Sequence, residues 1–150
     1  DVYNSYANFL CSKDRFTEAY ETFGKAVKIP SYANISGVYV NASACAHHQK
    51  NYSLSLAYID KAIDYDGASP ELFAIKAQLA LDAGDMPTAK TAIAVFDRMA
   101  KGKESPRSYL DKIKIADSEH NINESMRLGK ELVEKYPNSS QAREYMNNEY

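Results

Sequence analysis

The chain has 150 residues and a formal net charge of −2, and charged side chains make up 25% of it. This length suits one domain with a sizeable core, and the balanced charge gives no electrostatic basis for binding nucleic acid. No apolar run approaches the ~18 residues of a membrane span, and nothing at the start reads as a signal peptide. The chain opens on Asp1, without Met, in what reads as the middle of a helix, so we expect a processed or trimmed piece of a longer protein.

Six Gly, five Pro and the lack of alternating strand patterns predict helices throughout a single domain, residues 1–150. In chain order the predicted repeats are residues 1–29, 33–66, 70–100 and 106–136, followed by a partial C-terminal capping helix at 139–150. Prolines mark the boundaries of these units, because proline starts helices well and cannot continue them. The boundary prolines are Pro30, Pro70, Pro106 and Pro137.

The repeats are recognised by an aromatic or apolar anchor that recurs at intervals of 36, 34 and 36 residues. The anchors are Phe16, Tyr52, Met86 and Ile122. Three residues after each anchor stands a small residue, respectively Ala19, Ser55, Ala89 and Ser125. Small side chains let two antiparallel helices approach closely, while larger ones fill the space around the contact. This period and pattern match the tetratricopeptide repeat, and predict an all-α, tetratricopeptide-like right-handed superhelix, an α-solenoid of antiparallel helix pairs.

The fourth repeat fits the pattern least well. Ile113 and Leu132 stand at positions that are small elsewhere, and Gly129 stands at a position that is large elsewhere. A degenerate last unit is typical of the terminal cap of a repeat array. An irregular helical bundle with chance periodicity is the alternative.

Candidate catalytic and metal-binding residues are few. His47 and His48 are adjacent and would point about 100° apart on a helix, whereas chelation needs a spacing of three or four residues. The glycines are isolated, so no phosphate-binding loop is predicted, and no nucleophile elbow accompanies the Ser, His and Asp residues. The acidic group Asp60, Asp64 and Asp66 reads as solvated surface. We therefore expect no enzyme, no metal and no cofactor.

Two cysteines, Cys11 and Cys45, fall late in the first helices of consecutive repeats. Such helices lie side by side in a solenoid. The pair could be two buried thiols, or a disulfide that clasps the first two repeats in an oxidising compartment. The residues alone leave both possibilities open.

The first helices of a tetratricopeptide array line its concave face, where partners commonly bind. Mapped from the anchors, this predicted protein-binding groove is rich in amides, partly apolar and low in charge. It lacks the Lys and Arg set that clamps a carboxylate in some co-chaperones, and it suits an extended backbone or a partner's helix or strand. The predicted lining is Asn4, Asn8, Val40, Ala44, His47, Ala74, Gln78, Leu81, Leu110, Lys114 and Asp117.

Four short stretches resemble the type IV pilus biogenesis lipoproteins of the PilF/PilW family, the secretin pilotins. Residues 4–11, NSYANFLC, are similar to the family's N-x-Y-(G/A)-x-F-L-C, and residues 41–45, NASAC, to its N-x-G-x-C. Residues 30–33, PSYA, resemble its P-x-Y-x insertion, and residues 128–139, LGKELVEKYPNS, its L-x(n)-F-P-x-S ending. Ser43 departs from the family, which favours Gly there, and the family's lipidated N-terminal cysteine and first repeats do not occur in this sequence.

The resemblance implies a lipoprotein on the periplasmic face of the outer membrane of a Gram-negative bacterium. It would assist the localisation or assembly of the pilus secretin, which is the implied principal partner alongside other pilus assembly proteins. Contact with the membrane would come only through an N-terminal lipid anchor outside this chain. Because the periplasm is oxidising, the resemblance also favours the disulfide between Cys11 and Cys45.

Two other functions remain open: a generic peptide- or protein-binding adaptor in another complex, and, less favoured, a hydrolase or metalloenzyme. The oligomeric state is not predicted.

Overall fold

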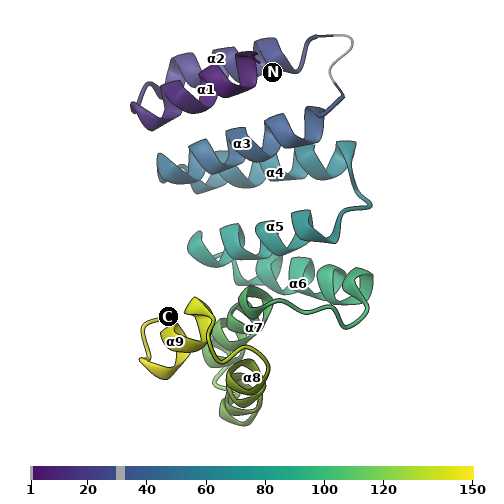
Figure 1. Cartoon of the computed structure of the whole chain (residues 1–150), viewed down its shortest axis with the longest axis vertical. Coiled ribbons are helices and arrows are strands. Elements are labelled where there is room, and N and C mark those ends of the chain that lie inside the picture. The colour runs from purple at the N-terminus through teal and green to yellow at the C-terminus, as the bar shows by residue number, and fades with distance from the viewer. Residues whose placement is uncertain (1, 30–32) are drawn as a thin grey trace.

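The computed structural model describes residues 2–29 and 33–150, and this part of the chain forms nine α-helices and no strands. Figure 1 shows α1–α6 as three stacked helix pairs that lie across the long axis of the molecule. The α7–α8 pair is turned away from that direction, and α9 lies beside it. The helices are α1 Val2–Ser12, α2 Phe16–Ala26, α3 Ile35–His48, α4 Tyr52–Tyr65, α5 Pro70–Asp82, α6 Met86–Ala100, α7 Pro106–Ser118, α8 Ile122–Lys135 and α9 Ser140–Met146.

The turn within each pair begins in the same way in all four pairs. Two residues before the anchor the backbone is left-handed, with positive φ. The residues at this position are Asp14, Lys50, Gly84 and His120. In the last three pairs the next residue caps the second helix by accepting a backbone N–H with its side chain; these caps are Asn51, Asp85 and Asn121. The anchor is then the first residue of the second helix, so a fixed turn geometry sets the direction of each return helix.

The close approach of paired helices occurs at small residues. Ala7 and Ala19 are fully buried between α1 and α2, and Phe23 packs in the same core cluster. Between α3 and α4, Ser43 donates to the carbonyl of Ser55 at 2.8 Å while Ser55 donates to the carbonyl of Ser43 at 3.0 Å. Serine is accommodated at position 43 because each buried hydroxyl donates its hydrogen bond to a backbone carbonyl of the opposite helix.

Prolines stand at the first turn of α5, α6 and α7, and a fourth follows the end of α8. Pro30, which is expected to end the first unit, lies outside the described residues, as does most of the 30–33 stretch. None of the described helices is long and apolar enough to cross a membrane.

Gly129 in α8 departs from the repeat pattern because another helix uses the space. A Cβ atom placed on Gly129 would lie 1.9 Å from Cζ of Tyr145, which belongs to α9. The ring of Tyr145 therefore occupies the place that a large residue fills in earlier repeats. Ala142 of α9 is fully buried in the core cluster that contains Leu128 and Leu132, so the last helix closes the end of the array.

We predict that Gly129→Ala destabilises the protein by about 1–3 kcal/mol, because the ring of Tyr145 must move and α9 with it. Thermal unfolding followed by circular dichroism measures the effect. Gly24→Ala in α2 is the matched control, since nothing lies within 4 Å of the added methyl group. This control should stabilise by about 0.5–1 kcal/mol through helix propensity. Equal effects at the two positions would contradict the packing of Tyr145 against Gly129.

Candidate functional site: the face of the first helices

Five of the predicted lining residues fall into two separate hollows on the face formed by α1, α3, α5 and α7. The N-terminal hollow, of about 290 Å³, lies between α1 and α3. The C-terminal hollow, of about 460 Å³, lies among α5, the start of α6, α7 and the residues after α9. The predicted residues Asn8 and Ala44 line the first, and Leu81, Lys114 and Asp117 line the second.

The N-terminal hollow is built on amides and on sulfur. Asn41 of α3 lines it and donates to Oδ1 of Asn4 at 3.0 Å, which ties α3 to α1. His48 lies at its rim, with Nε2 3.1 Å from a carboxylate oxygen of Asp14. Asn8 is exposed, so its amide is accessible to a bound backbone. The amide groups can donate to and accept from a peptide main chain.

Cys11 and Cys45 lie in the wall of this hollow and are almost completely buried. Their sulfur atoms are bonded at 2.10 Å, and their Cα atoms lie 5.8 Å apart, within the usual range for a disulfide. The bond links α1 to α3 across the boundary between the first two pairs. Formation of this bond in the cell stays a prediction.

The C-terminal hollow is charged. Lys114 lies 3.6 Å from a carboxylate oxygen of Glu144 in α9, and Asp117 faces the hydroxyl of Tyr150. Between the two hollows, Nε2 of His47 lies 2.9 Å from Oδ2 of Asp82, and this contact joins α3 to α5. The prediction of a low-charge groove therefore describes the N-terminal hollow better than the C-terminal one.

Other predicted lining residues contribute to packing. Val40 is half-buried against the core cluster of Ile59, and Ala74 is half-buried against that of Ile93. Leu110 is fully buried, so its prediction as a groove residue is wrong. Gln78 is half-buried on α5. Besides its repeat neighbours, α7 contacts the C-terminal helix α9, a contact that has no counterpart at α1, α3 or α5.

Several residues of the two hollows escaped the sequence analysis. Asn41 and Asp82 stand one helical turn from predicted residues, on the same helices, so a wider stripe would have found them. Tyr150 reaches the C-terminal hollow only through tertiary packing, which includes stacking on Tyr145 at 5.9 Å between ring centroids. No sequence signal indicates that contact.

Asp111 of α7 is a fully buried carboxylate beside the C-terminal hollow. Nε of Arg107 lies 3.0 Å from its Oδ1, yet neither carboxylate oxygen accepts a well-aligned hydrogen bond from the described residues. Burial raises the pKa of the Asp111 carboxyl to about 6. The charges of Arg107 and Lys114 lower this pKa, while Asp82 of α5 raises it further. The desolvation of the carboxylate thus outweighs its ion pair.

In the described part of the chain, no group of three His, Cys, Asp or Glu residues could hold a metal ion. His47 and His48 contact different aspartates, Asp82 at the end of α5 and Asp14 in the turn between α1 and α2.

Solved structures similar to this one confirm the predicted fold. PilW, described as a widely conserved type IV pilus biogenesis factor, superposes with a TM-score of 0.83 over 97% of this chain at 22% identity. PilF of Pseudomonas aeruginosa superposes with a TM-score of 0.73 over 98% of this chain at 23% identity. The likeness confirms an all-α solenoid of helix pairs and, at the level of fold, the resemblance noted in the sequence.

The chain is shorter than the proteins it matches. It spans 66% of PilW and 65% of PilF. An uncharacterised protein of Haemophilus influenzae is 29% identical over 73 residues, which is 49% of this chain and 41% of that protein. No protein-family model matches the chain.

We predict that replacing both Cys11 and Cys45 with Ser lowers the free energy of unfolding by roughly 3–4 kcal/mol, because the bond closes a loop of 34 residues. Urea unfolding without reductant measures the loss. Adding reductant should bring the native protein to the stability of the double variant and leave that variant unchanged. Two free thiols in unreduced periplasmic protein, detected by mass spectrometry, would rule out the disulfide.

We also predict that the buried Asp111 makes stability depend on pH. Its folded pKa of about 6 lies above the unfolded value of 3.8, so the folded state holds the proton more tightly. This contribution is complete below about pH 4 and is lost as pH rises through 6. Asp111→Asn should therefore be more stable than the native protein at pH 8, by up to about 3 kcal/mol, with the difference vanishing near pH 4.

Chemical denaturation at a series of pH values measures this difference. Asp64→Asn, on the exposed surface of α4, is the matched control and should leave the profile unchanged. A variant Asp111→Asn that is less stable than the native protein at pH 8 would show that the pair with Arg107 favours the charged form.

Proposed function

We propose that this chain is a non-enzymatic tetratricopeptide scaffold for type IV pilus biogenesis. The observation that carries the proposal is the superposition of nearly the whole chain on PilW, a type IV pilus biogenesis factor. PilF of Pseudomonas aeruginosa adds support, and so do the two cysteine-containing stretches that resemble the PilF/PilW family.

In this proposal the scaffold assists the outer-membrane localisation or assembly of the pilus secretin and acts on the periplasmic face of that membrane. Placement in the periplasm agrees with a disulfide between Cys11 and Cys45, because that compartment is oxidising. An anchor to the membrane would belong to a part of the protein outside this chain.

The N-terminal hollow is the proposed contact for an extended segment of the secretin. Its exposed Asn8 and half-buried Asn41 offer amides to a peptide backbone, and the exposed Ala44 leaves room between them. The disulfide in the wall of the hollow holds α1 and α3 at a fixed separation, so the site is organised before the partner arrives. Main-chain hydrogen bonds would supply affinity, and the small residue at position 44 would let the backbone approach.

A generic protein-binding adaptor in another envelope complex is the alternative. It shares the helix-pair fold and the same hollows. The two functions differ in the partner, so direct binding of the secretin separates them.

We predict that Ala44→Arg weakens binding of the purified secretin by about tenfold or more, because the new side chain fills the N-terminal hollow with charge. Biolayer interferometry measures the affinity, and the fraction of secretin recovered with the outer membrane measures the effect in cells. Ala57→Arg is the matched control, since Ala57 is exposed on α4, outside the hollow. Absence of secretin binding to the native full-length protein would favour the adaptor.

A further inference from the structure

Four stacked tyrosines, which we call the tyrosine seam, run from α2 of the first pair onto α4 and α3 of the second: Tyr20, Tyr58, Tyr39 and Tyr65. Tyr58 is one of its inner rings, with its centroid 5.8 Å from that of Tyr20 and 6.2 Å from that of Tyr39. The ammonium group of Lys61 lies 5.5 Å from the ring centroid of Tyr58 and 5.6 Å from that of Tyr39. The stack of Tyr20 on Tyr58 therefore joins the first pair to the second, and Tyr39 and the cation of Lys61 hold the ring of Tyr58 from within its own pair.

The next boundary along the array lacks the inner ring. Thirteen residues before the anchors Tyr52 and Met86 stand Tyr39 and Phe73, so an aromatic residue occurs in both pairs. Six residues after the same anchors stand Tyr58 and Ala92. A methyl group thus occupies the position of the ring that bridges the tyrosine seam.

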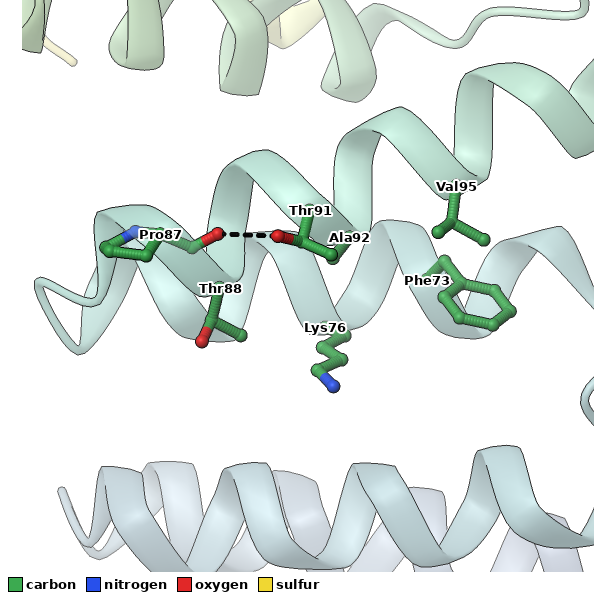
Figure 2. A pocket seen from close by; sticks show the side chains of 7 residues that line it. All are labelled: Phe73, Lys76, Pro87, Thr88, Thr91, Ala92 and Val95. Atoms are coloured by element: carbon green, nitrogen blue, oxygen red, sulfur yellow. Dashed lines mark hydrogen bonds between the residues drawn. The ribbon is translucent and has the colours of Figure 1, made fainter.

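An open cavity lies where that ring is missing. It has a volume of about 250 Å³ and is lined by Phe73, Lys76, Pro87, Thr88, Thr91, Ala92 and Val95. Figure 2 shows that Phe73 and Val95 form one end of this Ala92 cavity, and that Lys76 and Thr88 point from α5 and α6 toward the preceding helix pair. An apolar cavity of about 150 Å³ is enough to hold benzene, so the space is large enough for an aromatic ring.

The lining also has the electrostatic character that suits a ring. The hydroxyl of Thr91 already donates to the carbonyl of Pro87 at 3.0 Å, so it adds little polarity. Lys76 is the cation of the lining, with Nζ 2.6 Å from a carboxylate oxygen of Asp60 and its side chain 25% exposed. The negative face of an aromatic ring complements an ammonium group, as the Lys61 contacts illustrate in the tyrosine seam.

We propose that the Ala92 cavity binds an aromatic side chain of a partner polypeptide, which takes the place that Tyr58 fills in the preceding pair. The ring packs against Phe73 and Val95 and presents a face to Lys76. The cavity shares no lining residue with the two hollows on the face of the first helices, although α5 and α6 also contribute residues to the C-terminal hollow. This binding site does not depend on the proposed role in pilus biogenesis.

The test uses N-acetyl-tyrosinamide as the probe and N-acetyl-leucinamide as its aliphatic match, each titrated into the ¹⁵N-labelled chain and followed by NMR. The tyrosine probe should shift the backbone amides of Phe73, Lys76 and Thr91 and bind about tenfold more tightly than the leucine probe. Ala92→Tyr fills the cavity from within and should abolish these shifts. Ala94→Tyr, on the exposed side of the same helix, should leave them intact.

The reciprocal variant Tyr58→Ala should open a second site, at which the probe shifts the amides of Tyr20 and Tyr39. If this variant fails to fold, the comparison of Ala92→Tyr with Ala94→Tyr still decides the matter. Equal binding of both probes, or shifts that persist in Ala92→Tyr, would overturn the proposal. So would self-association of the native chain that Ala92→Tyr abolishes, because the occupant would then be a second copy.

Discussion

The whole array depends on how closely the two helices of each pair approach. In the first two pairs that distance is set at one contact, where Ala7 meets Ala19 and Ser43 meets Ser55. The serine contact constrains the helices more strongly than the alanine contact. Each serine hydroxyl donates to a backbone carbonyl of the opposite helix, so the register is fixed as well as the distance. A larger residue at either position would separate the helices and expose the core behind them.

The repeated turn converts this local contact into an array. A left-handed residue, an N-cap and an anchor follow one another at the start of α4, α6 and α8, so each return helix leaves its turn in the same direction. Asn, Asp and Gly tolerate or favour these roles, although Lys50 and His120 adopt the left-handed conformation without that advantage. The left-handed conformation persists at these two residues because the packing of the two helices that flank each turn outweighs its local cost.

Contacts within a helix pair could be predicted from the sequence, whereas contacts with other elements could not. Anchors, small residues and prolines act within one pair, and their spacing is enough to predict helix pairs and the solenoid. Burial against elements outside the pair does not follow from this spacing, and Leu110 proved to be buried on α7, which also contacts the C-terminal helix α9. Gly129 looked like a defect in the pattern until Tyr145, sixteen residues further along, proved to occupy its space. Asp111 could not be distinguished from a surface aspartate, since its burial comes from neighbouring helices.

Positions at which one repeat differs from its neighbours point to contacts from outside the repeat. Residues that recur at equivalent positions maintain the array, so a position where one repeat departs from its neighbour must be explained by some other contact. At Gly129 that contact lies within the chain, because the ring of Tyr145 fills the space. At Ala92 the described chain leaves a cavity instead. One repeat earlier the ring of Tyr58 stacks on Tyr39, and Phe73 is the aromatic residue at the position of Tyr39. Because this cavity is open, its apolar wall is left in contact with water, and a ring supplied by another polypeptide would bury that surface.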